Sequence, residues 1–190
     1  MSSARPRRVG TVVDGDHLQA ILSEYGVETS GWGEGEAKAL GHLLTELRAG
    51  DCELVVDERG LARLVRNVWV DVFAHVGAAR HHLVERRQVF IDGRTRRRSL
   101  PASIGEKCTV GEDPAVAAVR GIAEELGIVS PLALTPGEPR ENPVGPPSYP
   151  TLRTLYDTAW YVVELDASDY RPEGYVEVQS DKSTYFEWES

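Results

Sequence analysis

A short segment, residues 111–128, carries three glutamates and one arginine whose spacing could bind a divalent cation: Glu112, Arg120, Glu124 and Glu125. Arg120 lies eight residues after Glu112 and four before Glu124, where on a helix it can pair with that carboxylate and fix its rotamer. Mg²⁺ prefers a few carboxylate oxygens together with water and the phosphate oxygens of a substrate. Adjacent glutamates are also common on solvated helix faces, so the acids alone leave both interpretations open.

The same segment has the signals of one complete helix. Asp113 is a good N-cap, Pro114 suits the first helical position, and Gly127 suits the C-terminal stop. Apolar residues recur with the helical period and predict one buried face, made of Ala115, Val119, Ile122 and Leu126. Arg120 and the two adjacent glutamates then fall on the opposite side, so we expect them to stand on a helix that is anchored from behind.

The longer pattern resembles the Nudix box, G-x5-E-x7-R-E-U-x-E-E-x-G-U, where U is a bulky aliphatic residue. The residues that match it in register are Glu112, Arg120, Ile122, Glu124, Glu125, Gly127 and Ile128. The resemblance implies that Mg²⁺ or Mn²⁺ is held by Glu112, Glu124 and Glu125, with Arg120 orienting them. It also implies a phosphorylated small-molecule substrate, namely a nucleoside diphosphate-linked or other organic diphosphate whose phosphoanhydride bond is hydrolysed.

Two positions depart from the family pattern. Gly121 directly follows the arginine, where the family has a catalytic and metal-binding glutamate, and Glu106 replaces the opening glycine, although Gly105 is its neighbour. Glycine inside a helix costs about 1 kcal/mol relative to alanine. Gly121 therefore removes a carboxylate and weakens the helix, which means that the chemistry has either moved or been lost.

A general base from outside the box would replace the missing acid, and the candidates are Glu106, Glu173, Glu177 and Asp181. We favour Glu177, because it lies just before the last predicted strand. Each of these acids, taken alone, can also be interpreted as an ordinary loop acid.

A basic segment between residues 80 and 98 contrasts with the formal net charge of −9 of the whole chain. Strand alternation would place Arg94, Arg96 and Arg98 on one face, where guanidinium groups could clamp a phosphate. A solvated hairpin paired with surface glutamates is the alternative. Tyr149, in the proline-rich segment 136–150, is the expected stacking residue for a nucleobase.

Apolar runs predict strands before and after the box helix, at residues 54–56, 61–65, 68–76, 82–91, 94–100, 129–134, 158–163 and 184–188. Two further helices are expected, one ending at Gly26 and one over residues 36–49. Strands on both sides of one helix indicate an α+β fold. This agrees with the fold that the resemblance implies, a Nudix-like mixed-sheet α/β/α sandwich with an N-terminal helical extension.

We expect three regions along the 190 residues: a flexible basic tail over 1–9, a helical and strand extension over 10–65, and a Nudix-like domain over 66–190. The extension would cover part of the sheet or form a homodimer contact. The acidic net charge argues against nucleic acid as a partner, and no apolar run of 18 residues predicts a membrane span. Two isolated cysteines predict reduced thiols and a cytoplasmic location.

Three hypotheses for function follow from these patterns. The leading one is a divergent Nudix-type hydrolase that uses Mg²⁺ or Mn²⁺. The second is a catalytically impaired Nudix-fold module that binds a phosphorylated ligand. The third is a Nudix-fold enzyme recruited to another biosynthetic reaction. Gly121 favours the last two, whereas the intact glutamate pair and Arg120 favour the first.

Overall fold

Two structural units make up the chain in the computed structural model, which describes residues 5–98, 100–141 and 147–189. Unit 1 contains described residues 5–66, 107–111 and 147–157, and unit 2 contains the remaining described residues. Two long strands, β3 (Gly60–Val76) and β8 (Arg153–Leu165), contribute residues to both units. The division at Arg66 falls next to the predicted boundary, but unit 1 also takes in two segments that the sequence assigns to the second domain.

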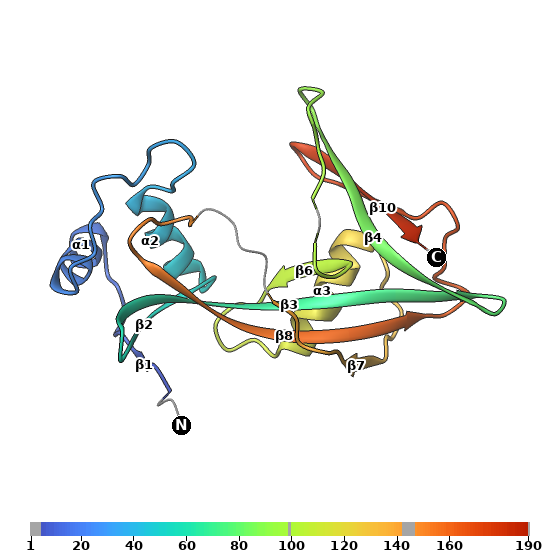
Figure 1. Cartoon of the computed structure of the whole chain (residues 1–190), viewed down its shortest axis with the longest axis horizontal. Coiled ribbons are helices and arrows are strands. Elements are labelled where there is room, and N and C mark those ends of the chain that lie inside the picture. The colour runs from blue at the N-terminus through green and yellow to red at the C-terminus, as the bar shows by residue number, and fades with distance from the viewer. Residues whose placement is uncertain (1–4, 99, 142–146, 190) are drawn as a thin grey trace. The chain divides into compact units, whose positions relative to one another are not determined.

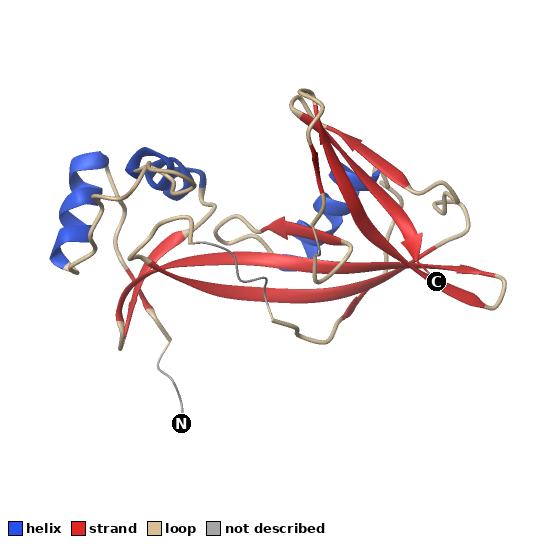
Figure 2. Cartoon of the chain, turned by 45° about the horizontal axis from the view of Figure 1, so that its top comes forward, coloured by secondary structure: helices blue, strands red, loops and turns tan. Residues whose placement is uncertain are grey.

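Unit 1 consists of two helices packed on a β-hairpin (Figures 1 and 2). Helices α1 (Gly15–Glu24) and α2 (Leu40–Ala49) contact each other, and β2 (Glu53–Asp57) pairs antiparallel with the first half of β3. Apolar side chains from both helices and the hairpin share one core, which includes Leu18, Leu22, Leu43, Leu54 and Leu61. The strands predicted at residues 54–56 and 61–65 are therefore confirmed, and they pair with each other.

The prediction of a flexible tail is wrong at β1 (Arg7–Arg8). These two residues pair antiparallel with Val56 and Val55 of β2, so their backbone groups extend the sheet edge. Arg8 also forms an ion pair with Glu53 at 2.9 Å. Residues 1–4 of the predicted tail lie outside the described residues.

Unit 2 is an antiparallel sheet with one helix, α3 (Pro114–Leu126). The second half of β3 pairs with β4 (Ala79–Phe90), β4 with β10 (Lys182–Glu189), and β10 with β9 (Tyr175–Val178). Shorter strands complete it, namely β5 (Thr95–Arg96) on β4, β6 (Ile104–Lys107) on β3 and β7 (Leu134–Pro136) on β8. Helix α3 lies against β9 and beside β6 (Figure 1). The predicted α+β class, with strands on both sides of the box helix, is confirmed.

Several strands differ from the predicted ones. Strand β3 is continuous where the sequence suggests two strands, because Arg66 pairs with Glu53 and Asp157 instead of breaking the ladder. The strand expected at 129–134 forms only at β7, since Val129 is 87% exposed and buries no surface. The strand expected at 94–100 shortens to β5.

Candidate active site

Helix α3 has the predicted ends but not the predicted buried face. The Asp113 side chain accepts a hydrogen bond from the Ala115 N–H at 2.8 Å, and Gly127 ends the helix with φ +67°. Val119, expected to be buried, is 39% exposed, whereas Gly121 is buried. The buried face contains two large apolar residues, Ile122 and Leu126. Its other members are small and permit a close approach: Ala117, Ala118 and Gly121. This rotation corrects the prediction for Glu125, which lies on the partly covered side instead of the solvent side.

Gly121 lies in close contact with β6. A Cβ atom at Gly121 would lie 3.0 Å from Glu106 Cβ and 3.3 Å from Glu106 Cγ. On the other face of β6, a Cβ at Gly105 would lie 2.1 Å from an atom of the Trp69 ring. Successive strand residues point to opposite faces, so Gly105 admits Trp69 on one side and Glu106 faces α3 on the other. Gly121, where the Nudix box pattern has a glutamate, therefore leaves space for the side chain of Glu106 from β6.

The Arg120 guanidinium contacts three carboxylates. Glu112 accepts two hydrogen bonds from it at 3.2 Å, Glu106 lies at 3.4 Å, and Glu124 lies at 3.7 Å. Hydrogen bonding to Glu112 raises the pKa of Arg120, and the charge of Glu106 acts in the same direction, whereas burial acts against both. The structure thus brings together three residues that the sequence pattern links, and adds Glu106 to them.

Glu125 lies in an acidic environment. Burial raises the pKa of Glu125 to about 8, and the charges of Glu177, Glu106 and Glu85 act in the same direction, against a smaller opposing effect from Arg98. Glu177, on β9, accepts a hydrogen bond from the Gln179 amide at 2.6 Å. The structure therefore places Glu177, the favoured base candidate, within electrostatic range of the box helix.

The carboxylates fit a hard divalent cation in their chemistry. Burying an ionised carboxylate among other acids is unfavourable unless a positive charge offsets it, and carboxylate oxygens are the ligands that Mg²⁺ prefers. Within the part of the chain that the structure describes, however, no group of three or more His, Cys, Asp or Glu side chains is arranged to hold a metal ion. Arg120 instead engages Glu106, Glu112 and Glu124.

The predicted clamp of Arg94, Arg96 and Arg98 does not form. Arg94 is exposed and pairs with Asp92 at 2.6 Å, and Arg96 is exposed on β5. Arg98 lies beyond β5 and makes a two-pronged contact with the carboxylate of Glu85. Because the strand ends at Arg96, alternation does not bring the three side chains together.

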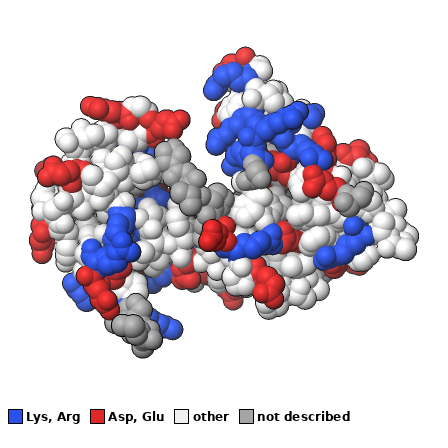
Figure 3. Space-filling view, in the orientation of Figure 1, with Lys and Arg blue, Asp and Glu red and all other residues white. Residues whose placement is uncertain are grey.

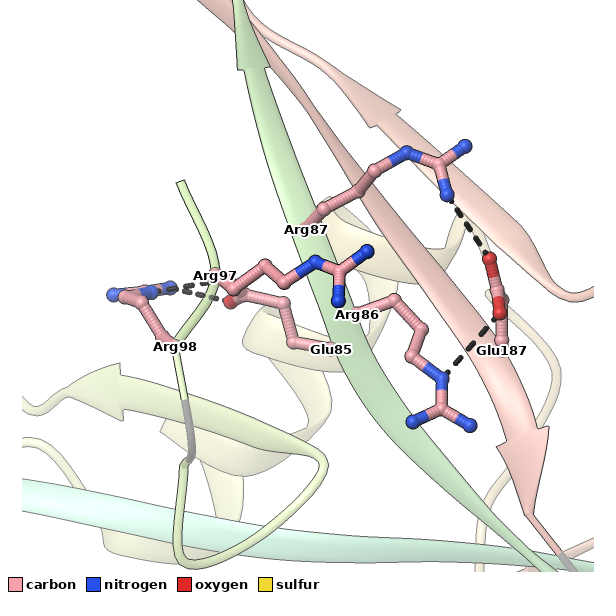
Figure 4. A pocket seen from close by; sticks show the side chains of 6 residues that line it. All are labelled: Glu85, Arg86, Arg87, Arg97, Arg98 and Glu187. Atoms are coloured by element: carbon pink, nitrogen blue, oxygen red, sulfur yellow. Dashed lines mark hydrogen bonds and ion pairs between the residues drawn. The ribbon is translucent and has the colours of Figure 1, made fainter. Parts of the chain in front are cut away.

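A different set of arginines lines a cleft of about 440 Å³ on unit 2, together with two acids: Glu85, Arg86, Arg87, Arg97, Arg98 and Glu187 (Figure 4). Figure 3 shows lysine and arginine side chains gathered over this part of the surface. The sequence pattern marks the basic segment but does not assign Arg86, Arg87 or Arg97 to a site.

Tyr149, the predicted stacking residue, belongs to the core of unit 1 and is 1% exposed. Its ring packs on Trp32 with centroids 5.0 Å apart, and the Arg63 guanidinium lies 5.1 Å from the ring centroid. Trp32 is held in turn by a hydrogen bond from its indole N–H to the Pro150 carbonyl at 2.8 Å. These contacts leave no open ring face for a nucleobase, so the expectation for Tyr149 is wrong.

A second constellation, Asp71, His82 and Ser103, resembles a nucleophilic triad in composition only. His82 Nε2 lies 3.1 Å from Asp71 Oδ1 and 3.2 Å from Ser103 Oγ, so both partners meet the same ring nitrogen. A triad needs the acid on one ring nitrogen and the nucleophile on the other. Ser103 is also fully buried, where its hydroxyl donates to the Leu83 carbonyl and accepts from the Val72 N–H. The group is therefore a structural network.

Comparison with known proteins gives similarity at the level of structure. No family model and no curated protein matches this chain. The chain is similar to DR0079 from Deinococcus radiodurans, with 21% sequence identity and a TM-score of 0.38 over 65% of each chain. It is also similar to Ap4A hydrolase of C. elegans, with 12% identity and a TM-score of 0.35 over 66% of this chain and 79% of that one. The chain thus spans less than two thirds of the length of DR0079.

None of the described helices is both long enough and apolar enough to cross a membrane.

Proposed function

We propose that the chain is a metal-dependent hydrolase that cleaves a phosphoanhydride bond in a nucleoside diphosphate-linked or other organic diphosphate. In this proposal Glu106 provides the carboxylate that Gly121 lacks. The proposal draws on the box pattern in the sequence and on the surroundings of α3.

The packing of Glu106 on Gly121 is the observation that carries the proposal. An enzyme that had simply lost its acid would not need a glycine at this position, because alanine is better in a helix by about 1 kcal/mol. Here the missing side chain leaves the space that Glu106 Cβ and Cγ occupy, at 3.0 and 3.3 Å from the position of a Cβ at Gly121. The carboxylate of Glu106 then lies 3.4 Å from the Arg120 guanidinium.

The side chains have separate roles in this proposal. Glu124 and Glu125 hold Mg²⁺ or Mn²⁺, with Glu106 in place of the third box acid. A bound divalent cation neutralises the diphosphate and lowers the pKa of an attacking water. Arg120, fixed by Glu112, sets the positions of Glu106 and Glu124. Glu177 would accept the proton of the water, because it lies on β9, the strand that packs against α3.

A substrate panel tests the proposal. We expect turnover of at least one compound among nucleoside triphosphates, ADP-ribose, dinucleoside polyphosphates and prenyl diphosphates, with Mg²⁺ or Mn²⁺ present and products followed by chromatography. Glu125→Gln and Glu106→Gln should each reduce the rate by at least about 100-fold, because each removes a carboxylate that would hold the cation, and a bound cation contributes several kcal/mol of transition-state stabilisation. The exposed Glu138→Gln is the matched control and should keep the rate.

Metal binding is a readout that does not depend on the substrate. Mn²⁺ should raise the unfolding temperature of the wild type, because a ligand that binds only the folded state stabilises it. Glu125→Gln should remove this effect, and Glu138→Gln should keep it. If the wild type shows neither turnover nor stabilisation by Mn²⁺, the hydrolase proposal is wrong.

The second candidate function is a module that binds a phosphorylated ligand without cleaving it. The contacts of Arg120 favour it, because three carboxylates that would serve a cation already share this guanidinium. Ligand binding that is independent of divalent cations, without turnover of any compound in the panel, would support this candidate instead.

A further inference from the structure

A β-bulge in β4 turns two consecutive arginines toward the same carboxylate. Tyr185 of β10 pairs with Arg87, but the next residue, Phe186, pairs with Glu85, so Arg86 is an extra residue in the ladder. Consecutive residues of a regular strand point to opposite faces, and a bulge changes this direction. As a result, Arg86 Nε lies 3.4 Å and Arg87 Nη1 lies 3.3 Å from the Glu187 carboxylate.

The cleft beside this bulge carries more positive than negative charge. Its lining contains four arginines and two glutamates and so has a formal charge of +2, in a chain of net charge −9. The Arg98 guanidinium group already neutralises the Glu85 carboxylate, whose side chain is only 1% exposed. Glu187 is shared between Arg86 and Arg87, and Arg86 also pairs with Glu189, which does not line the cleft.

The arginine side chains are held in place but remain accessible to a ligand. Arg87 lies over the Tyr185 ring, 4.4 Å from its centroid, and Arg86 forms a second ion pair with Glu189 at 2.7 Å. Both side chains are still more than 40% exposed. From the opposite wall, Arg97 extends toward β4 (Figure 4), and no described side chain forms an ion pair with it.

The cleft lies within electrostatic range of Glu125. Arg98 and Glu85 line the cleft, and their charges also act on Glu125. The cleft and Glu125 both belong to unit 2.

We propose that the cleft formed by Arg86, Arg87, Arg97 and Arg98 binds phosphate groups of the substrate that are not cleaved. Arginine binds phosphate oxygens in two-pronged geometry, and several guanidinium groups around one hollow favour an anion with more than one charge. This inference rests on the proposed function for the position of the reacting bond. It adds a substrate class, namely an organic polyphosphate that carries at least one phosphate group beyond the two at the bond that breaks.

Calorimetric titration of the full chain with inorganic tripolyphosphate and with pyrophosphate, in EDTA and at low salt, tests the inference. We expect tripolyphosphate to bind at least about tenfold more tightly than pyrophosphate. Arg97→Ala and Arg87→Gln should each weaken tripolyphosphate binding at least about tenfold, and Arg97→Lys should recover part of the loss. The matched control is Arg94→Ala, on the same hairpin but outside the cleft, and it should bind as the wild type does.

Three results would overturn the inference: no binding of tripolyphosphate by the wild type, equal weakening by Arg94→Ala and Arg97→Ala, or equal affinity for the two anions. Circular dichroism checks that each variant is folded, and the exposed position of Arg97 makes its alanine variant the safest probe. Because the titration uses neither metal nor turnover, failure of hydrolysis leaves it unaffected. Hydrolysis that persists without tripolyphosphate binding would overturn this inference alone.

Discussion

Two glutamates on helices of the two units, Glu46 and Glu125, show opposite responses to burial. Glu46 on α2 is 8% exposed and forms ion pairs with Arg63 at 2.7 Å and Lys38 at 2.5 Å. Burial raises its pKa, but the hydrogen bond from Lys38 and the charges of Arg63 and Lys38 outweigh burial, so the pKa is lowered. At Glu125, burial and three acidic neighbours act together and raise the pKa to about 8.

The difference between these two residues distinguishes Glu46, which stabilises the fold, from Glu125, which is a candidate functional residue. Burial is the largest influence on both carboxyl groups, so burial alone does not distinguish them. The sign of the neighbouring charges does: unit 1 supplies cations for Glu46, and unit 2 surrounds Glu125 mainly with acids. Groups whose charged form the protein leaves uncompensated are concentrated at functional sites.

The largest predicted effect concerns Glu46. Glu46→Gln removes the charge that compensates Arg63, whose side chain is 8% exposed. Breaking a buried ion pair by removing one partner costs about 3–5 kcal/mol, so we expect a loss of this size in the free energy of unfolding at pH 7, measured with urea. The exposed Glu24→Gln on α1 is the control and should change stability by less than about 0.5 kcal/mol. A loss below about 1 kcal/mol for Glu46→Gln would contradict the assigned role.

The same substitution at Glu125 should act in the opposite direction. Because the folded-state pKa of about 8 exceeds the ordinary value of 4.5, ionisation of Glu125 costs stability as the pH rises between these values. In EDTA at pH 9, Glu125→Gln should be more stable than the wild type by about 2–4 kcal/mol, after allowance for relaxation around the charge. At pH 4 this advantage should disappear. An unfolding free energy difference that is the same at both pH values would refute the contrast with Glu46.

The smallest predicted effects are changes in stability when either of two glycines in helices is replaced by alanine. Gly41 of α2 has open space where a Cβ would lie, so Gly41→Ala should stabilise the chain by about 0.5–1 kcal/mol. Gly121→Ala places its Cβ 3.0 Å from Glu106 Cβ, and overpacking should turn the gain into a loss of about 1 kcal/mol.

A double-mutant cycle tests the cause of that difference. In the background of Glu106→Gly, the substitution Gly121→Ala should again stabilise the chain, because the contact is absent. The coupling energy, obtained from urea unfolding, should be about 1–2 kcal/mol. Additive effects of the two substitutions would show that Glu106 does not explain Gly121.

The sequence was sufficient for features that depend on neighbours along the chain. Asp113, Pro114 and Gly127 define α3 because caps act within one helical turn, and the contact of Arg120 with Glu124 follows from their separation by four residues. The prediction for the buried face of α3 is wrong, because apolar periodicity selects Val119. The close approach of α3 to β6 requires a small residue on that face, and Gly121 meets this requirement.

Features that depend on contacts distant in sequence could not be predicted. The bulge at Arg86 arises from register with β10, about a hundred residues away, so alternation counted along one strand gives the wrong partners. Tyr149 reads as a loop residue, although its contacts with Trp32 and Arg63 bury it. The prolines around it gave no signal for this burial.

The contact between Gly121 and Glu106 also limits how the two positions can change over evolutionary time. A chain with glutamate at both positions would force two side chains into the space of one, whereas a chain with glycine at both would fold but lack the acid. A stepwise exchange of the two residue types that passes through the glycine–glycine chain avoids this crowding. In related sequences, the two positions should vary together as one inherited unit.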